Sequence, residues 1–218
     1  MKSSKKNFYV VHLSQWQRWP TELEQLSIFQ VDRCMKPENF GPIRTHFCDA
    51  SKNGYGTVSR FTNQMGRVHV AFVLGKSRVT PLKQITIPRL ELAAATLPVK
   101  VDWMLKRELQ VELEGSTFWM DSASVLGYTH NKTKRFHTFV ANRVSVINKL
   151  SQESWWRHVS SKDNPADDIS LGLHVEPFLK SSRWLMGPDY LGKEETDWPI
   201  CQLIEYYSSW PAAELVGY

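Results

Sequence analysis

Alternating hydrophobic and polar residues in the first third of the chain predict three neighbouring β-strands. The alternation is clearest over residues 68–75, where every second position carries a large hydrophobic side chain, as in a strand with one buried face. Residues 44–48 and 56–62 are also rich in β-prone side chains, and short polar turns separate the three segments. Short turns join antiparallel neighbours, so we expect a three-stranded antiparallel meander.

Hydrophobic residues spaced by three and four positions predict helices. One stripe follows Pro88, a residue that suits the first position of a helix, and continues to Leu105. Pro98 lies within this stripe and is expected to cost about 3 kcal/mol unless the helix kinks there. A second stripe covers residues 135–150, and a third, over residues 14–29, predicts a helix in the lead-in.

Shorter segments complete the order of elements. Strands are expected at residues 116–120 and 155–160, and helices at residues 122–130 and 164–172. In the last helix Asn164 is the expected cap, Pro165 the first helical residue, and Gly172 the end. This order predicts an α/β fold (an α+β mixed sheet) of five strands, with three antiparallel strands first and helices on both faces. The tail from residue 173 is expected to be irregular and anchored by tryptophans.

Composition and charge exclude several classes of protein. The 218 residues are 42% hydrophobic and 22% charged, which suits one sizeable core and excludes a disordered chain. The net charge of +5 permits a polyanionic partner without requiring one. The three cysteines form no C-x-x-C pair, so neither a zinc site nor a disulfide framework is expected. No signal peptide and no run of ~20 apolar residues is evident, so we expect no membrane partner and a cytoplasmic or nuclear location.

Four acidic residues follow or begin elements that can meet at one edge of the sheet. Asp49 and Asp121 end the first and fourth strands, which can lie side by side, while Glu91 and Asp167 lie in the first turns of predicted helices. Each alone has another explanation, such as capping a turn or favourable interaction with a helix dipole. Four converging carboxylates would need cations, and oxygen-only ligands suit Mg²⁺ or Mn²⁺. Two such ions can promote cleavage of a phosphodiester.

Several motifs carry a resemblance to a known family. They are FCDAS (47–51), IPRLELAAA (87–95), FWMDSASVL (118–126), RFHTFVANRV (135–144) and NPAD (164–167). Together they resemble the RNase H region of BEL/Pao-type long-terminal-repeat retrotransposon polyproteins, which implies a ribonuclease H-like fold. RWLMGPDYL (183–191) is similar to the linker that follows this domain, and the lead-in around Trp16 and Trp19 resembles the connection from the reverse transcriptase. The resemblance implies a connection over residues 1–42, an RNase H-like domain over 43–173, and an extension toward the integrase region over 174–218.

The resemblance also implies an activity, namely hydrolysis of the RNA strand of an RNA–DNA hybrid with two Mg²⁺ ions, for which Mn²⁺ can substitute. The implied partners are the hybrid and the reverse transcriptase portion of the polyprotein. By position, the four metal-binding catalytic acids of the family match Asp49, Glu91, Asp121 and Asp167. Residues expected to contact nucleic acid are Ser51, Lys52, Arg89, Ser122, Lys134, Arg135, Asn142 and Arg143, with Arg60 as a further basic contact.

Two other hypotheses remain open, and departures from the family at Pro98 and Leu171 motivate the first of them. Lys162 stands near the place of a histidine found in retroviral domains, and Leu171 stands where an arginine is usual. The first alternative is a weakly active or inactive host-retained copy that binds nucleic acid or has a structural role. The second is an integrase-type transferase, whose glutamate would be Glu153, although that residue precedes a predicted strand instead of lying in a helix. Mg²⁺-dependent cleavage of a hybrid, lost in Asp121→Asn, separates the nuclease from the first alternative, and a strand-transfer assay tests the second.

Overall fold

The computed structural model describes residues 17–31, 42–63, 68–109, 115–131, 135–181 and 183–200, which fall into two compact units. One unit comprises residues 1–34 and 173–182, and the other comprises residues 35–172 and 183–218. In the first unit, residues 17–24 are helical and lead into η1 (Gln25–Ile28), which contacts α6 (Val175–Lys180). The helix expected in the lead-in is therefore present from residue 17 onward, and its predicted start lies outside the described part.

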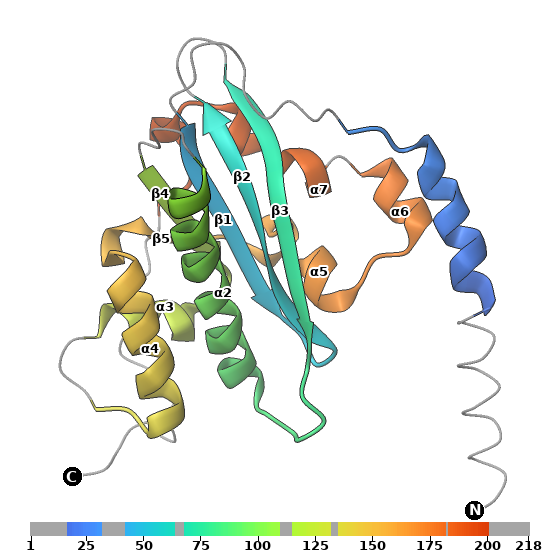
Figure 1. The fold of residues 1–218 in the computed structure, drawn as a ribbon. Helices are drawn as coiled ribbons and strands as arrows, with labels where there is room; N and C mark the ends of the chain where they lie inside the picture. Colours follow the sequence, from blue (N-terminus) through green and yellow to red (C-terminus); the bar gives the residue numbers. More distant parts are fainter. Residues whose placement is uncertain are drawn as a thin grey trace, which may run out of the picture. The chain divides into compact units, whose positions relative to one another are not determined.

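The second unit contains one mixed sheet of five strands, in the order β3-β2-β1-β4-β5 (Figure 1). The strands are β1 (Pro42–Ala50), β2 (Gly54–Asn63), β3 (His69–Val79), β4 (Gly115–Met120) and β5 (Trp156–His158). β2 pairs antiparallel with both β1 and β3, whereas β4 pairs parallel with both β1 and β5. The expected mixed sheet is confirmed, and the first and fourth strands do lie side by side.

Each strand differs at one or both ends from the predicted range, and the ends of β3 and β5 have identifiable causes. β3 continues to Val79, into a stretch expected to be a loop, because β2 begins at Gly54 and pairs with Val79 there. β5 is only three residues long, because Trp155 belongs to the 3₁₀ turn η2 (Glu153–Trp155) before it and Ser160 is the N-cap of the 3₁₀ turn η3 (Ser161–Asp163) after it. Alternation of side chains identified β3, but the ends of both strands depend on pairing with a neighbour and on the turns beside them.

Helices and 3₁₀ turns cover both faces of the sheet (Figure 1). One face is covered by α2 (Ile87–Glu108), α3 (Ala123–His130) and α4 (Thr138–Leu150). The other is covered by α5 (Asp167–Leu171), α7 (Arg183–Met186), η4 (Asp189–Gly192) and the residues around η5 (Glu195–Asp197). Pro98 lies inside α2 and is buried. No helix in the described ranges is both long and apolar enough to cross a membrane.

The last helix of the predicted domain begins at Asp167, two residues later than the expected first helical residue, Pro165. Asn164 is not its cap, because residues 164–166 form a turn in which the amide of Asp167 donates to the carbonyl of Asn164 at 3.2 Å. The helix ends as predicted at Gly172, whose φ of +82° suits a residue without a side chain.

Side-chain alternation along β1 and β4 creates two hydrophobic cores. Cys48 and Phe118 belong to the core formed with α2, α3 and α4, whereas their neighbours Phe47 and Trp119 belong to the core on the opposite face. Trp198 completes this second core and is 2% exposed, with its ring 6.1 Å from that of Trp119. The tryptophan anchors expected in the tail therefore include Trp198, a residue of the second core.

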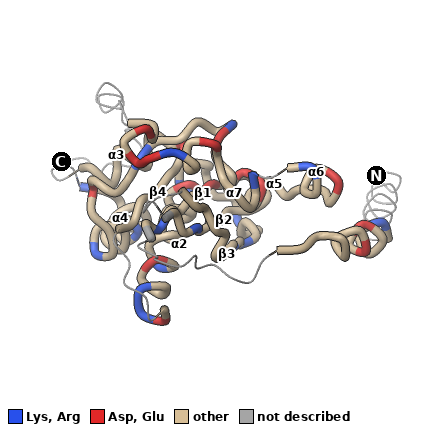
Figure 2. Tube along the Cα trace, turned by 90° about the horizontal axis from the view of Figure 1, so that it is seen from above, with Lys and Arg blue, Asp and Glu red and all other residues tan. Residues whose placement is uncertain are grey.

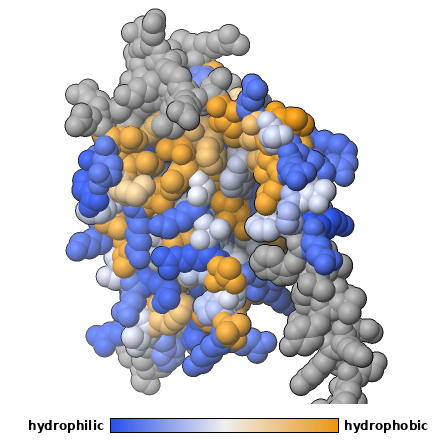
Figure 3. All heavy atoms as spheres, turned by 45° about the vertical axis from the view of Figure 1, so that its right-hand side comes forward, coloured by the Kyte–Doolittle hydropathy of each residue, from blue (hydrophilic) through white to orange (hydrophobic). Residues whose placement is uncertain are grey.

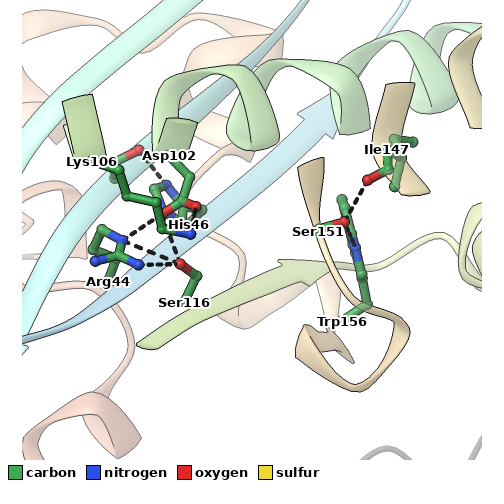
Figure 4. A network of polar contacts seen from close by, with 9 residues as sticks. Arg44, His46, Asp102, Lys106, Ser116, Ile147, Ser151 and Trp156 are labelled. Atoms are coloured by element: carbon green, nitrogen blue, oxygen red, sulfur yellow. Dashed lines mark hydrogen bonds and ion pairs between the residues drawn. The ribbon is translucent and has the colours of Figure 1, made fainter. Parts of the chain in front are cut away.

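A buried ionic network joins α2 to the beginnings of β1 and β4 (Figure 4). Asp102 on α2 accepts hydrogen bonds from Arg44 Nε at 2.5 Å and from Ser116 Oγ at 2.7 Å. Its second oxygen lies 2.7 Å from the ammonium of Lys106, and His46 Nε2 lies 3.2 Å from the first. Burial opposes ionisation of Asp102, but the hydrogen bonds from His46 and Lys106 and the nearby positive charges outweigh it and lower its pKa. The network therefore fixes α2 on the sheet.

Hydrophobic residues also reach the surface. On the face drawn in Figure 3 they lie between hydrophilic residues. In the described part of the chain, the most exposed large hydrophobic side chains include Val79, Leu82 and Ile200. Exposed apolar residues at scattered positions are ordinary for a globular protein.

Candidate metal centre

Asp49 lies near the carboxyl end of the central strand. It is the penultimate residue of β1, pairs with Gly56 of β2, and is 9% exposed. The hydroxyl of Ser170, on α5, donates a hydrogen bond to its Oδ2 atom. Burial raises the pKa of Asp49, and the neighbouring charge of Asp121 raises it further. The carboxyl group is thus held in place and lies in an environment that disfavours its ionised form.

Asp121 follows the last residue of β4, the parallel neighbour of β1. Its Oδ2 atom accepts a hydrogen bond from the hydroxyl of Ser161 at 2.6 Å. The helix that follows is capped by Ser122, whose side chain accepts from the amide of Val125. Asp121 is therefore not the cap of α3, and the alternative explanation for this acid is removed.

Glu91 reaches the same region from α2. The helix begins at Ile87, so Glu91 lies beyond the first turn in which it was expected, and that turn contains no acidic residue. A favourable interaction with the helix dipole therefore does not explain its position. The hydroxyl of Ser122 donates to Glu91 Oε2 at 2.7 Å. Burial raises the pKa of Glu91, and the charges of Asp121 and Asp49 add to this effect.

Asp167 is the first residue of α5, as the first-turn prediction required. The preceding turn is anchored by Asn164, whose Nδ2 donates to the carbonyl of Cys48 at 3.1 Å and whose Oδ1 accepts from the amide of Ala166 at 3.1 Å. Because Cys48 precedes Asp49, this anchor brings the fourth acid to the first. Burial, followed by the charges of Asp49 and Asp121, raises the pKa of Asp167 to about 7.

Tight packing of α5 on β2 depends on a glycine. A Cβ atom at Gly56 would lie 2.1 Å from Cγ2 of Ile169 and 2.8 Å from the carbonyl oxygen of Lys76. Only a residue without a side chain allows this approach. Ile169 lies between Asp167 and Ser170, so the close contact helps to hold both polar residues at the sheet edge.

Three of the four predicted acids converge. Carboxylate oxygens of Asp49, Asp121 and Asp167 all lie within 4.8 Å of one another. Glu91 is not in this group of three, although its charge interacts with Asp49 and Asp121. An oxygen-only donor set with strong mutual repulsion fits a hard divalent cation such as Mg²⁺ or Mn²⁺.

Four of the residues expected to contact nucleic acid make hydrogen bonds or aromatic-ring contacts within the protein. Ser51 Oγ donates to the carbonyls of Gly54 at 3.3 Å and Ser170 at 2.5 Å, which ties the β1–β2 turn to α5. Ser122 has the bonds to Glu91 and to α3 given above. Arg89 and Arg143 lie over the ring of Phe139, with the guanidinium carbons 5.3 Å and 3.4 Å from the ring centroid.

Three of the four remaining expected contacts are on the surface of the sheet-containing unit. Lys52, Arg135 and Asn142 are exposed, and Lys134 lies outside the described residues. Figure 2 marks the lysines and arginines in blue, among them those along α2 and α4.

The expectation that Arg60 contacts nucleic acid is wrong. Its side chain is completely buried. It donates to the backbone carbonyls of Arg183 at 3.0 Å and Leu185 at 3.1 Å and to that of Trp184, which take the place of water as hydrogen-bond acceptors. Burial lowers the pKa of Arg60 to about 9. Alternation alone does not separate a buried arginine from an exposed one, and the partners of Arg60 are more than 120 residues away in the chain.

Sequence reasoning missed the residues that orient the acids. Ser161 and Ser170 donate to Asp121 and Asp49, and Arg183 donates to Asp168, the neighbour of the fourth acid, at 2.5 Å. The sequence did contain a signal for Ser170, because this residue follows Asp167 by three positions and so lies on the same face of a helix. Ser161 and Arg183 have no local signal, since the fold alone brings them to the acids.

A comparison with protein families matches about the first half of the chain. Residues 5–122 match the model of the Pao retrotransposon-like RNaseH-like domain, a span that includes Asp49, Glu91 and Asp121 but not Asp167. No curated protein matches the chain.

Solved structures of RNase H domains are similar at low identity. The N-terminal RNase H domain of rv2228c from Mycobacterium tuberculosis, solved as a fusion with maltose-binding protein, is 13% identical, with 59% of this chain and 91% of that chain covered and a TM-score of 0.42. LC11-RNase H1 in complex with an RNA/DNA hybrid is 16% identical, with 63% and 99% covered and a TM-score of 0.44. RNase H1 from the archaeon Halobacterium salinarum NRC-1 is 10% identical, with 65% and 100% covered and a TM-score of 0.35.

Proposed function

The chain belongs to the Pao retrotransposon-like RNaseH-like domain family, and we propose that it is a nuclease that hydrolyses the RNA strand of RNA–DNA hybrids with two divalent metal ions. The observation that carries this proposal is the convergence of Asp49, Asp121 and Asp167, whose carboxylate oxygens lie within 4.8 Å of one another. These acids come from three separate parts of the chain. Repulsion among ionised carboxyl groups destabilises the folded state. A bound cation would offset this repulsion and stabilise the folded state, which explains why the three acids converge.

The acids are proposed to hold the ions. Asp49, Asp121 and Asp167 would supply carboxylate oxygens directly, and Glu91 would complete the set from α2. Mg²⁺ is the proposed ion, and Mn²⁺ has the same preference for oxygen ligands. When bound, a pair of such ions would activate water and stabilise the leaving oxygen of a phosphodiester.

The chain's own polar groups would prepare this site for its ions. The hydroxyls of Ser170, Ser161 and Ser122 each donate to one acid, namely Asp49, Asp121 and Glu91. A donated hydrogen bond leaves each of these carboxylates with further lone pairs for a metal ion and fixes its rotamer. The three serines therefore favour a single arrangement of the acids.

Recognition of the hybrid is proposed to use basic residues beside the acids. Arg89 precedes Glu91 by less than one helical turn, and both Arg89 and Arg143 lie over the Phe139 ring. This stacking limits the motion of two planar guanidiniums that can contact phosphates and 2′-hydroxyls. Lys52, Lys134, Arg135 and Asn142 are proposed as further contacts. The reverse transcriptase portion of a polyprotein is the proposed protein partner, which places the activity in reverse transcription.

A cleavage assay tests the proposal. The full chain is incubated with an RNA–DNA hybrid labelled on the RNA strand, with Mg²⁺, with Mn²⁺ or with a chelator. We expect cleavage of the RNA strand that requires the metal and that falls at least 100-fold in Asp121→Asn, since a metal-bound carboxylate is lost. The control is Asp189→Asn, which makes the same chemical change at an exposed carboxyl and should retain full activity.

Two results would contradict the proposal. A wild-type chain that folds, as judged by circular dichroism, but cleaves no hybrid with either ion would favour an inactive copy of the domain. Equal cleavage by wild type and Asp121→Asn would show that the observed nuclease activity does not come from this site.

A further inference from the structure

The segment from Arg183 to Trp198 packs as part of the sheet-containing unit, although it follows the expected RNase H-like domain of residues 43–173. Trp184 lies against β3, with its ring 5.6 Å from that of Phe72 and its edge next to Gly75. Trp198 lies at the other end of the segment, in the second core. Figure 1 shows α7 beside β3. The segment therefore covers one face of the sheet.

The beginning of this segment is fixed by a buried cation. Arg60, on β2, donates to the carbonyls of Arg183, Trp184 and Leu185, which are successive residues of α7. The chain then turns at Gly187, whose φ is +76° and where a Cβ atom would lie 2.8 Å from Leu191 and 3.2 Å from Arg60 Nε. The backbone at Arg183 is therefore held firmly on the sheet.

From this fixed backbone, the Arg183 side chain links two elements of the candidate metal centre. Its Nη1 donates to the carbonyl of Lys162, in η3 (Ser161–Asp163), at 2.9 Å. Its Nη2 donates to Asp168 Oδ1, in α5, at 2.5 Å. The Asp168 side chain is 10% exposed and that of Arg183 is 30% exposed, so the pair is partly shielded from water.

Each of these two elements positions one acid. η3 contains Ser161, which donates to Asp121 at 2.6 Å, and α5 begins with Asp167. A guanidinium is planar and rigid. Its two hydrogen bonds therefore fix the distance between the Lys162 carbonyl and the Asp168 carboxylate that accept them. Its positive charge also lies close enough to Asp167 to interact with that carboxyl group.

We propose that Arg183 is a positioning residue that sets the spacing between Asp121 and Asp167, and that the nuclease domain extends to Trp198. This inference rests on the proposed function, in which these acids bind metal ions. Arg183 does not itself contact the ions. It acts through Ser161 and through the first turn of α5.

The experiment compares full-length variants. Arg183→Gln removes the charge and the two bonds, and Arg183→Lys keeps the charge without the planar fork. The control is Arg157→Gln, which breaks a different ion pair of the segment, between Arg157 Nη2 and Glu195 Oε1 at 2.6 Å. This pair joins the segment to β5, and neither of its residues is among those that hydrogen-bond to the acids in the described structure.

Three measurements are made on each variant. Amide hydrogen exchange over residues 161–163 and 167–171 is recorded without metal or nucleic acid. The affinity for Mn²⁺ is measured by isothermal titration calorimetry, and hybrid cleavage is measured as kcat and KM over a range of Mn²⁺ concentrations. Thermal unfolding shows that each variant is folded.

In Arg183→Gln we expect faster exchange in both segments and Mn²⁺ binding that is about 10–100-fold weaker, as for other residues that orient metal ligands. The loss of kcat should be partly restored at high Mn²⁺, with KM for the hybrid within about twofold of wild type. Arg183→Lys should lie between wild type and Arg183→Gln. Arg157→Gln should bind Mn²⁺ like wild type.

The inference is overturned if Arg183→Gln is folded and keeps wild-type exchange in the two segments, or if its Mn²⁺ affinity is unchanged. An equal loss in Arg157→Gln also overturns it, because that result would reflect general loosening of the segment. A wild-type chain that binds no Mn²⁺ refutes the proposed function instead. The exchange measurement in the metal-free protein still tests the structural link independently.

Discussion

Asp167 gives the sharpest test of the electrostatics at the candidate metal centre. Burial and the charges of Asp49 and Asp121 raise its pKa from 3.8 to about 7. In the folded, metal-free protein this carboxyl therefore holds its proton more tightly than in the unfolded chain. The folded state loses stability relative to the unfolded state as pH rises from about 4 to about 7, and this cost is fully present above pH 7.

The expected free-energy cost follows from the size of the pKa shift of Asp167. A change of about three pKa units corresponds to about 4 kcal/mol if no screening occurs. The side chain is partly accessible to solvent, so screening reduces the expected cost to about 1–2 kcal/mol. Asp167→Asn keeps the shape of the side chain and removes its charge. We expect the substitution to stabilise the metal-free protein by about 1–2 kcal/mol at pH 8 and to change its stability by less than about 0.5 kcal/mol at pH 4.

Urea denaturation in the presence of a chelator, at pH 4 and pH 8, measures both values. Asp189→Asn is the matched control, since this carboxyl is exposed and its removal should change stability little at either pH. Added Mg²⁺ should stabilise the wild type at pH 8 and stabilise Asp167→Asn much less, because binding to the folded state is weakened. The reasoning is refuted if Asp167→Asn shifts stability equally at both pH values or destabilises the protein at pH 8.

Two further substitutions test the packing around the site. Gly56→Ala should destabilise the protein by about 1–3 kcal/mol in urea denaturation, because the new methyl group would overlap Ile169. Its control is Gly115→Ala, where nothing lies within 4 Å, and an equal loss in the two variants would contradict the prediction. Asp102→Ala should cost about 3–5 kcal/mol by leaving the charge of Arg44 buried and unpaired, and a loss below about 1 kcal/mol would show that the network is dispensable.

The architecture could be predicted from the sequence because local patterns dominate it. Alternation and β-prone runs bounded by turns identified the strands, and the stripe after Pro88 identified α2 despite Pro98. The parallel pairing of β1 with β4 followed from the order of elements and put Asp49 beside Asp121. These predictions needed only neighbouring residues and general rules of connection.

The supporting contacts of the site could not be predicted in this way. Arg60 was expected on the surface because its side chain is charged. In the structure it is buried and donates to the carbonyls of Arg183, Trp184 and Leu185, which lie far along the chain. The link from Arg183 to α5 likewise depends on the packing of a segment that resembled a linker. Such partners are fixed by tertiary packing, and a single sequence carries no periodicity that marks them.

The distance along the chain between the two halves of the second core has a consequence for folding. Phe47 and Trp119 lie on early strands, whereas Leu191 and Trp198, which cover them, come at the end of the described chain. During synthesis the sheet can pair before this cover exists, and one apolar face then stays open to solvent and to chaperones. Contacts so distant in sequence also slow folding. Docking of residues 183–198 should therefore follow pairing of the sheet, and a ribosome stalled before Trp198 should hold a chain that is not yet protease-resistant.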